Sequence, residues 1–345
     1  MSESPGILFA MTVAYLPETT GGVESTTHET CLALLRRGWR PAVLAGHRGA
    51  GGGVVLGYPI HRRRESTRSA ADICRSLRAD LAIIQLGAIV PLARTLVENG
   101  IPALCYLHNL EFDSMGGDLF AHPLLRYLTN SNFMAERLTP RLGARPTVIP
   151  PLIDPERYRT KPTHEVVTFV NPLPVKGLEI ALHLAARRPD IPFEFVESWP
   201  LTFAERRRLA SALADLPNVR LTPRSDDMRA VYGRSRLLLA PSRWEESWGR
   251  VASEAQISGL PVIASRIGGL PEAVGKGGIL VDPDAPLAKW EAALVRLWDD
   301  PAAYRRYAAR ALAHAGRRAI RPDAVINSLC ALVLDPLAAC RGAAT

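Results

Sequence analysis

The chain has 345 residues, 47% of them hydrophobic, and a formal net charge of +8. This length favours two domains over a single core, and the mixture of apolar and charged residues is typical of a globular protein rather than a disordered chain. No stretch reaches the roughly 18 apolar residues of a membrane span, and the apolar run 7–14 lacks the basic flank of a signal peptide.

Cysteine usage and charge indicate a compartment and a class of partner. The five cysteines are scattered and include no Cys-x-x-Cys pair, so we expect a cytoplasmic protein without a disulfide framework or a zinc site. The run His61-Arg62-Arg63-Arg64 could contact a lipid surface or nucleic acid, but a solvated loop is the simpler interpretation. We therefore expect no nucleic acid partner and at most peripheral membrane contact; the sequence indicates no oligomeric state.

Apolar runs alternate with helical patterns along the first half, which predicts a parallel sheet with helices on its faces. Helices are predicted at 24–37, 69–78, 89–98 and 132–139, and the first of them ends at Gly38. The predicted strands are 7–10, 41–45, 81–85, 103–107 and 147–149.

The proline-rich segment 150–155 interrupts this alternation, and we expect a stiff connector there. A second series follows, with strands predicted at 166–170, 193–196, 219–221, 237–240, 261–264 and 278–281 and helices at 177–187, 203–213, 228–233 and 250–258. The sequence thus predicts two Rossmann-like domains, over 1–155 and 160–315, with a cleft between them. A C-terminal helix at about 320–345 is expected to pack back on the first domain.

Two common nucleotide-binding motifs are missing. The glycine run 49–53 lacks the third glycine of G-x-G-x-x-G and a helix to follow it, and no G-x-x-x-x-G-K-[ST] occurs. A dinucleotide site of that kind and a P-loop NTPase are therefore disfavoured.

Two loops carry groups that suit a phosphorylated ligand. Gly21 and Gly22 lie between the first strand and its helix, where glycines allow close approach to the backbone and a helix start offers N–H groups. An ordinary strand-to-helix turn is the alternative. Lys176, one of four lysines in the chain, follows the first strand of the second half and suits a diphosphate, unless it is a solvated loop lysine.

The segment 241–255 joins a buried strand to a helix and is the most informative part of the chain. We expect Glu246 in the loop and Glu254 on the helix, with the helix start between them. This arrangement suits a nucleotide-sugar, with one carboxylate on the sugar hydroxyls, helix N–H groups on the pyrophosphate and the other carboxylate on the ribose. Surface charge on the helix is the alternative for Glu254.

These residues carry a resemblance. Pro241-Ser242 followed by Glu246, seven residues and Glu254 resembles the signature of the family 4 retaining glycosyltransferases of the GT-B fold. The likeness continues through 259–264 and 268–272, and upstream through 21–24, 149–154 and 176–177, so that it spans roughly residues 7–300. It implies an α/β protein of the GT-B fold, with two Rossmann-like domains facing across a cleft.

The resemblance also implies roles at the donor. Glu254 would bind the ribose hydroxyls and Glu246 the donor sugar. Lys176 and the backbone at Trp248 and Gly249 would hold the pyrophosphate.

The same family implies further roles, and the chain departs from its pattern at two places. Gly21 and Gly22 would approach the phosphate and the acceptor from the other domain, and His108 matches the family's active-site histidine, although on sequence alone it could equally be a satisfied loop histidine. Asn171 would lie at the phosphates, where the family usually has an arginine. A second cation would then come from Arg243, Arg250, Arg224 or Arg266, or the phosphates are held differently. The segment 196–199 also departs from the family, replacing a glycine-rich turn that usually lies by the nucleotide base.

Together these features predict a metal-independent retaining glycosyltransferase that moves a sugar from a nucleoside-diphosphate sugar to an acceptor hydroxyl. We expect no cofactor, the donor mainly on the second domain and the acceptor on the first. Two alternatives stay open: a GT-B nucleotide-sugar epimerase, and a non-catalytic sugar-nucleotide or glycan-binding protein, which Asn171 keeps open.

Overall fold

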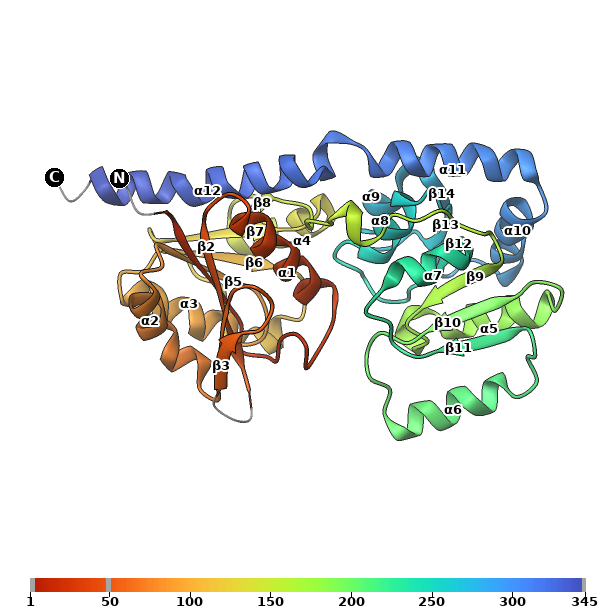
Figure 1. The fold of residues 1–345 in the computed structure, drawn as a ribbon, viewed down its shortest axis with the longest axis horizontal. Helices are drawn as coiled ribbons and strands as arrows, with labels where there is room; N and C mark the ends of the chain where they lie inside the picture. Colours follow the sequence, from red (N-terminus) through yellow and green to blue (C-terminus); the bar gives the residue numbers. More distant parts are fainter. Residues whose placement is uncertain (1–3, 48–50, 343–345) are drawn as a thin grey trace. The chain divides into compact units, whose positions relative to one another are not determined.

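The computed structural model describes residues 4–47 and 51–342, and the chain forms two compact units. The first unit comprises Met1–Leu152 and Pro322–Thr345, and the second comprises Ile153–Arg321. The chain therefore leaves the first unit once, completes the second, and returns (Figure 1).

Over the described residues, the first unit is built on an eight-stranded sheet with the order β3-β4-β2-β1-β5-β6-β7-β8. Neighbouring strands are parallel except for β3 and β4, which pair antiparallel at one edge. The strands are β1 (Gly6–Ala10), β2 (Arg40–Gly46), β3 (Gly51–Val54), β4 (Pro59–Arg63), β5 (Leu81–Ile84), β6 (Ala103–Leu107), β7 (Leu125–Thr129) and β8 (Thr147–Val148).

Helices cover both faces of this sheet, as a largely parallel sheet requires. α2 (Ser66–Leu77), α3 (Ile89–Glu98) and α4 (Asn132–Leu142) pack on one face. α1 (Gly22–Leu35) and α12 (Pro322–Gly342) pack on the other. The C-terminal helix thus belongs to the first unit, into whose core it inserts Val325, Ile326, Leu329 and Val333.

The second unit has a six-stranded parallel sheet with the order β11-β10-β9-β12-β13-β14, and every one of its residues is described. Its strands are β9 (Val166–Val170), β10 (Phe193–Val196), β11 (Val219–Thr222), β12 (Ser235–Ala240), β13 (Val262–Ser265) and β14 (Gly278–Val281). Its helices are α5 (Leu178–Arg187), α6 (Phe203–Leu213), α7 (Met228–Arg234), α8 (Arg250–Ile257), α9 (Leu270–Val274), α10 (Leu287–Trp298) and α11 (Pro301–Ala315). Apolar clusters fill the space on both faces of the sheet.

The basic run at residues 61–64 corrects the sequence interpretation, because its first three residues lie in strand β4 and not in a solvated loop. Arg62 and Ile60, two residues apart, both lie on the buried face of the strand. Its guanidinium donates to Glu18 Oε1 at 2.8 Å and to the carbonyl of Leu16 at 2.7 Å. A buried arginine is tolerated here because it is paired.

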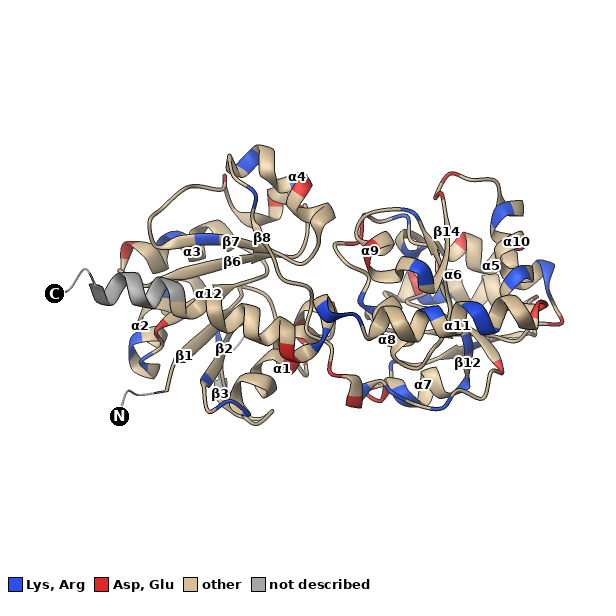
Figure 2. Cartoon of the chain, turned by 90° about the horizontal axis from the view of Figure 1, so that it is seen from above, with Lys and Arg blue, Asp and Glu red and all other residues tan. Residues whose placement is uncertain are grey.

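The remaining charge is spread over the molecule. Figure 2 shows Lys and Arg on elements of both units, with Asp and Glu between them. Across the part of the chain that is described, no helix combines the length and the apolarity needed to cross a membrane. Among the same residues, no three His, Cys, Asp or Glu side chains gather in a way that could hold a metal ion.

Candidate active site

The loops singled out in the second half leave neighbouring strands at one edge of the second sheet. The chain runs from β9 outward to β10 and β11 and then crosses to β12 on the opposite side of β9. In open α/β sheets, ligands bind outside the carboxyl ends of the strands where the strand order reverses in this way. The reversal lies between β9 and β12, whose following loops are 171–177 and 241–249.

Backbone contacts hold these two loops together. Gly177 has φ of +81°, and a Cβ at this position would collide with the carbonyl of Pro241. The carbonyl of Val175 accepts hydrogen bonds from the backbone N–H groups of Arg243 at 2.9 Å and Trp244 at 3.1 Å. The glycine after Lys176 is therefore required by the close approach of the second loop.

A pair of glycines supports the second loop from its other side. Gly268 has φ of +60°, and a Cβ on it would collide with the backbone of Glu246; one on Gly269 would collide with the carbonyl of Ser247. The N–H of Gly269 donates to the carbonyl of Glu246 at 2.6 Å. The close packing of Gly268 and Gly269 thus fixes the main chain that carries Glu246.

Lys176 and Glu246 meet at this edge. The Lys176 Nζ lies 2.6 Å from Glu246 Oε1, and the two side chains are 13% and 22% exposed. The ammonium predicted to hold phosphate and the carboxylate predicted to bind sugar are therefore in direct contact, although 70 residues separate them in sequence.

Glu254 lies on the first turns of α8 and is buried. Its Oε1 accepts from Arg250 Nε at 2.8 Å and its Oε2 accepts from the Tyr232 hydroxyl at 2.9 Å. Burial, reinforced by the charge of Glu254, raises the pKa of Tyr232, so that this hydroxyl stays a donor. Arg250 in turn donates to the Tyr158 hydroxyl at 2.7 Å. The carboxylate is held rigidly, and its position is set by a buried ion pair.

The start of α8 faces the same edge. Gly249 precedes the helix with φ of +93°, and no side chain of the described residues caps it. The first N–H groups of a helix lack intrahelical partners and favour an anion. Trp248, placed beside them, is buried and donates from its indole nitrogen to Ser253 Oγ at 3.0 Å.

The Asn171 side chain binds the protein backbone, whereas the arginine usual at this position in the family would bind phosphate. Asn171 is buried with φ of +72°, and its Oδ1 accepts the backbone N–H of Trp199 at 3.2 Å. It joins the ends of β9 and β10, which are adjacent in the sheet.

All four arginines considered as a replacement cation already form ion pairs. Their partners are Asp226 for Arg224 at 3.1 Å, Glu179 for Arg243 at 2.8 Å, Glu254 for Arg250 at 2.8 Å and Asp282 for Arg266 at 3.8 Å. Lys176 is therefore the cation that the structure brings to the carboxylate of Glu246.

Gly21 and Gly22 begin α1, at the carboxyl edge of the first sheet. Glu24 lies in the first turn of α1 and is buried. Burial raises the pKa of Glu24, while the nearby backbone N–H groups at the helix start oppose the rise. This helix start therefore presents a carboxylate, which suits a hydroxyl better than a phosphate.

Sequence reasoning included Glu24 in the glycine motif but gave it no role. The available signal was its place in the first helical turn, where an acidic side chain reaches back to the N-terminal N–H groups.

His108 follows β6 and is buried. Its ring centroid lies 4.1 Å from that of Tyr106, and its Nε2 finds no hydrogen-bond partner among the described residues. Burial lowers the pKa of His108 to about 3. The imidazole is therefore neutral near pH 7 and offers hydrogen bonds rather than a positive charge.

This pKa predicts an acid sensitivity. Below about pH 6.5, His108 is protonated in the unfolded chain but stays neutral in the folded chain. The free energy of unfolding therefore falls by about 1.4 kcal/mol for each pH unit, until the pH approaches the pKa of the folded state. We expect the melting temperature of the wild type to drop more between pH 7 and pH 5 than that of His108→Gln. His122→Gln, which changes a less buried histidine of the same unit, should follow the wild type. Parallel curves for the wild type and His108→Gln would contradict the assignment.

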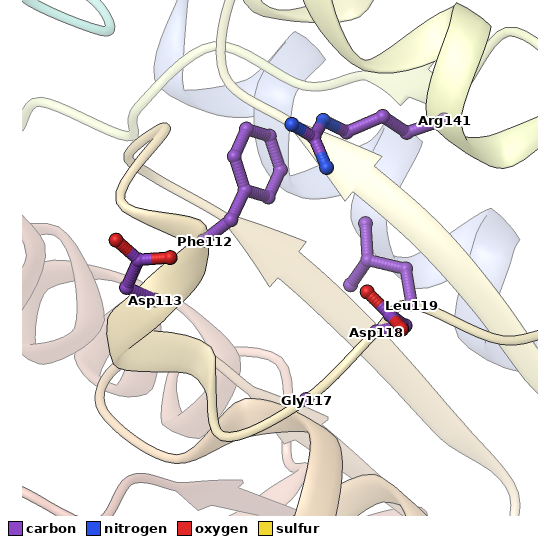
Figure 3. Close-up of a pocket in the computed structure, with 6 residues that line it drawn as sticks. All are labelled: Phe112, Asp113, Gly117, Asp118, Leu119 and Arg141. Carbon is purple, nitrogen blue, oxygen red and sulfur yellow. The ribbon is translucent and has the colours of Figure 1, made fainter.

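A cavity of about 540 Å³ lies elsewhere in the first unit. Figure 3 shows Arg141 of α4 reaching toward Phe112, whose ring centroid is 3.8 Å from the guanidinium carbon. The residues that line the cavity are Phe112, Asp113, Gly117, Asp118, Leu119 and Arg141. None of the predicted site residues lines this cavity.

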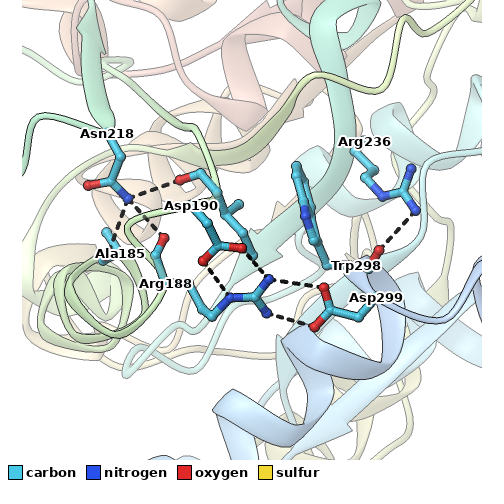
Figure 4. A network of polar contacts seen from close by, with 8 residues as sticks. Ala185, Arg188, Asp190, Asn218, Arg236, Trp298 and Asp299 are labelled. Atoms are coloured by element: carbon cyan, nitrogen blue, oxygen red, sulfur yellow. Dashed lines mark hydrogen bonds and ion pairs between the residues drawn. The ribbon is translucent and has the colours of Figure 1, made fainter.

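The opposite edge of the second sheet is closed by polar contacts (Figure 4). Arg188 pairs with both Asp190 and Asp299 at 2.7 to 3.0 Å, which lowers the pKa of Asp190. The Asn218 amide donates to the carbonyls of Ala185, Arg188 and Ile191 at 2.9 to 3.1 Å. These hydrogen bonds satisfy backbone carbonyl groups at the amino ends of the strands. The carboxyl edge of the sheet is therefore the expected place for a ligand.

Comparison with known proteins agrees with this geometry. The sequence model described as "Glycosyltransferase Family 4" matches residues 20–157, and that described as "Glycosyl transferases group 1" matches residues 166–300. Between them the two matches contain every predicted site residue.

Curated relatives match part of the chain. It is 38% identical over 172 residues to a D-inositol 3-phosphate glycosyltransferase of Corynebacterium glutamicum (strain R), which covers 45% of this chain and 40% of that protein. The protein of the same name from Acidothermus cellulolyticus is 32% identical over 259 residues, covering 64% and 55%. The chain thus spans about half the length of these relatives.

Solved structures resemble the whole chain. A glycosyltransferase from Rickettsia africae has a TM-score of 0.76 at 15% identity, covering 97% of this chain and 99% of that one. Anabaena HepE in complex with UDP-glucose has a TM-score of 0.77 at 17% identity, with the same coverage. At these identities the likeness shows the fold, and it confirms the predicted fold class of two Rossmann-like α/β domains. The chain belongs to the family 4 glycosyltransferases of the GT-B fold.

Proposed function

We propose that this chain is a retaining glycosyltransferase that takes its sugar from a nucleoside-diphosphate sugar. The observation that carries the proposal is the contact between Lys176 and Glu246, at 2.6 Å, on the sheet edge where the start of α8 also lies. A cation and helix N–H groups at one edge match the diphosphate of such a donor, and the carboxylate matches its sugar hydroxyls. The complex of HepE with UDP-glucose supports this donor class.

The site residues then divide the donor between them. Glu246 accepts hydrogen bonds from the sugar hydroxyls and Glu254 from the ribose. Lys176 and the backbone N–H groups at Trp248 and Gly249 hold the diphosphate. Asn171 acts through Trp199, whose N–H it accepts, and not as a phosphate ligand.

The reaction breaks the bond between the anomeric carbon and the phosphate oxygen and forms one from that carbon to the acceptor oxygen. Negative charge develops on the leaving phosphate, and Lys176 with the helix N–H groups stabilises it without reorganisation. The leaving phosphate takes the proton of the acceptor hydroxyl on the face where the new bond forms, so the configuration is retained. This scheme uses no cofactor and no metal ion.

We assign the acceptor to the first unit. Gly21 and Gly22 allow a close approach to its backbone, and Glu24 offers a hydrogen-bond acceptor to a hydroxyl. His108 contributes a neutral imidazole whose Nε2 needs a partner. The relatives named D-inositol 3-phosphate glycosyltransferase support a small polyol as the first acceptor to assay.

We also place the protein in the cytoplasm. Cys31, Cys74, Cys105 and Cys330 are thiols rather than disulfides, as in a reducing compartment.

The proposal is tested in two steps. UDP, ADP, GDP and their glucose conjugates are screened for a rise in melting temperature, because a ligand of the folded state stabilises it by mass action. The stabilising conjugate is then incubated with inositol phosphates and simple sugars, and the anomeric configuration of the product is read by NMR. We expect a product with the donor's configuration.

Other outcomes identify the alternatives. Binding of none of these compounds, or an inverted product, contradicts the proposal. Release of nucleoside diphosphate with an epimerised sugar, in the absence of acceptor, identifies an epimerase. Tight nucleotide binding without turnover over the whole panel identifies a binding protein.

A further inference from the structure

Trp199 lies at the predicted donor site. It follows β10, the neighbour of β9 in the sheet, and the residue is 40% exposed. The Lys176 Nζ lies 4.6 Å from the centroid of the indole ring. An ammonium at this distance from an indole face is attracted by the negative potential of the ring.

Two polar anchors fix the loop that carries Trp199. On one side, the buried Asn171 side chain accepts the Trp199 backbone N–H. On the other, the buried Glu197 carboxylate accepts two bonds from Arg206, at 2.6 and 2.9 Å. A bidentate pair of this kind fixes orientation as well as distance. The indole is therefore held beside Lys176 by its main chain and not by chance packing.

The geometry leaves one direction open at Lys176. An ammonium carries three N–H donors. Among the described residues, the Lys176 Nζ donates to Glu246 Oε1 at 2.6 Å, and the indole face occupies a second side. A donor that pairs with none of these residues is then left for a ligand.

We propose that Trp199 is the positioning residue for Lys176, and that Asn171 acts by anchoring Trp199. The indole face and Glu246 hold the ammonium so that its remaining donor meets the diphosphate. This inference rests on the proposed function and answers how a site with asparagine at position 171 binds a diphosphate. The site orders one cation in advance instead of supplying two.

The advantage lies in side-chain entropy. Lysine has a long flexible stem, and fixing it at the moment of binding weakens affinity. Ordering one such side chain in advance corresponds to an affinity gain of about threefold to tenfold.

The test compares variants by calorimetric titration with UDP, ADP and GDP. We expect Trp199→Leu and Asn171→Ala to raise the Kd by about threefold to tenfold, and Trp199→Phe to restore most of the affinity because it keeps an aromatic face. Phe203→Leu is the matched control, since Phe203 is a nearby aromatic residue that is 78% exposed. Melting temperatures measured alongside identify any variant that fails to fold.

A double-mutant cycle separates positioning from general support of the loop. In a Lys176→Met background, Trp199→Leu should raise the Kd no further, because its effect passes through the ammonium. An equal rise in both backgrounds, or no rise in the wild-type background, overturns the inference while leaving the proposed function standing. Failure of the wild type to bind any of the three nucleotides overturns both.

Discussion

Lys176→Met is expected to lower kcat/KM for sugar transfer by roughly 100- to 1,000-fold. Methionine keeps most of the length and packing of the side chain but removes the charge that faces the leaving phosphate. The loss should appear in kcat as well as in donor affinity, because the negative charge on the phosphate grows in the transition state. Steady-state kinetics with the donor identified by the binding screen separate the two parameters.

Lys276→Met is the control for this substitution. Lys276 is an exposed lysine of the same unit, in the short 3-10 helix Gly275–Gly277. The Lys276→Met enzyme should transfer sugar at the wild-type rate. A Lys176→Met enzyme within a factor of about three of the wild type would remove Lys176 from the mechanism, since a charge at a reacting phosphate is worth far more.

Glu254→Gln should weaken both the fold and the donor complex. Glutamine has nearly the same shape, but it leaves the buried Arg250 guanidinium without its carboxylate. Removing one partner of a buried ion pair costs about 3 kcal/mol, and losing a charged acceptor for ribose hydroxyls should raise the donor Kd by roughly 10- to 100-fold. Thermal unfolding measures the first effect and calorimetry with the nucleoside diphosphate measures the second.

Glu179→Gln provides the comparison for this prediction. Glu179 also pairs with an arginine, Arg243 at 2.8 Å, but its side chain is 52% exposed. Exposed pairs contribute little to stability, so this variant should melt and bind as the wild type does. A Glu254→Gln protein with unchanged melting temperature and unchanged Kd would show that the buried pair contributes neither to stability nor to donor binding.

The sequence predicted the buried strands of the second unit with most of their boundaries. Strands 166–170 and 193–196 were placed without error because valine and phenylalanine, residues typical of strands, make up most of each segment. The division between Glu246 in a loop and Glu254 on a helix was also confirmed, since Gly249 marks the helix start. Local patterns of residue type sufficed in these places.

Elements near the edges of the first sheet were harder to predict. β7 (Leu125–Thr129) was not predicted, because it includes the exposed Arg126 and the half-buried Tyr127 and so lacks an apolar run. β4 was read partly as loop because three consecutive basic or imidazole side chains hide the period-2 pattern that buries both Ile60 and Arg62. The ion pair with Glu18 and the hydrogen bond to the Leu16 carbonyl explain why that arginine is buried.

The contacts inside the candidate site lay beyond sequence reasoning for a different reason. Lys176 and Glu246 are 70 residues apart, and Asn171 and Trp199 are 28 apart. Each residue could be assigned to a loop, but their pairing depends on strand order, which residue patterns do not determine. The family resemblance indicated the loops, and the structure supplied the partners.

The return of the chain through α12 has a consequence for synthesis. Val325, Ile326, Leu329 and Val333 of α12 pack on one face of a sheet whose strands are all made before that helix. A nascent chain emerging from the ribosome leaves the part of that face under α12 uncovered until α12 has been translated, whereas residues 153–321 carry their whole core in one stretch. We expect the later-made unit to mature first and the earlier-made unit to depend on chaperones in the interval, because uncovered apolar surface promotes aggregation.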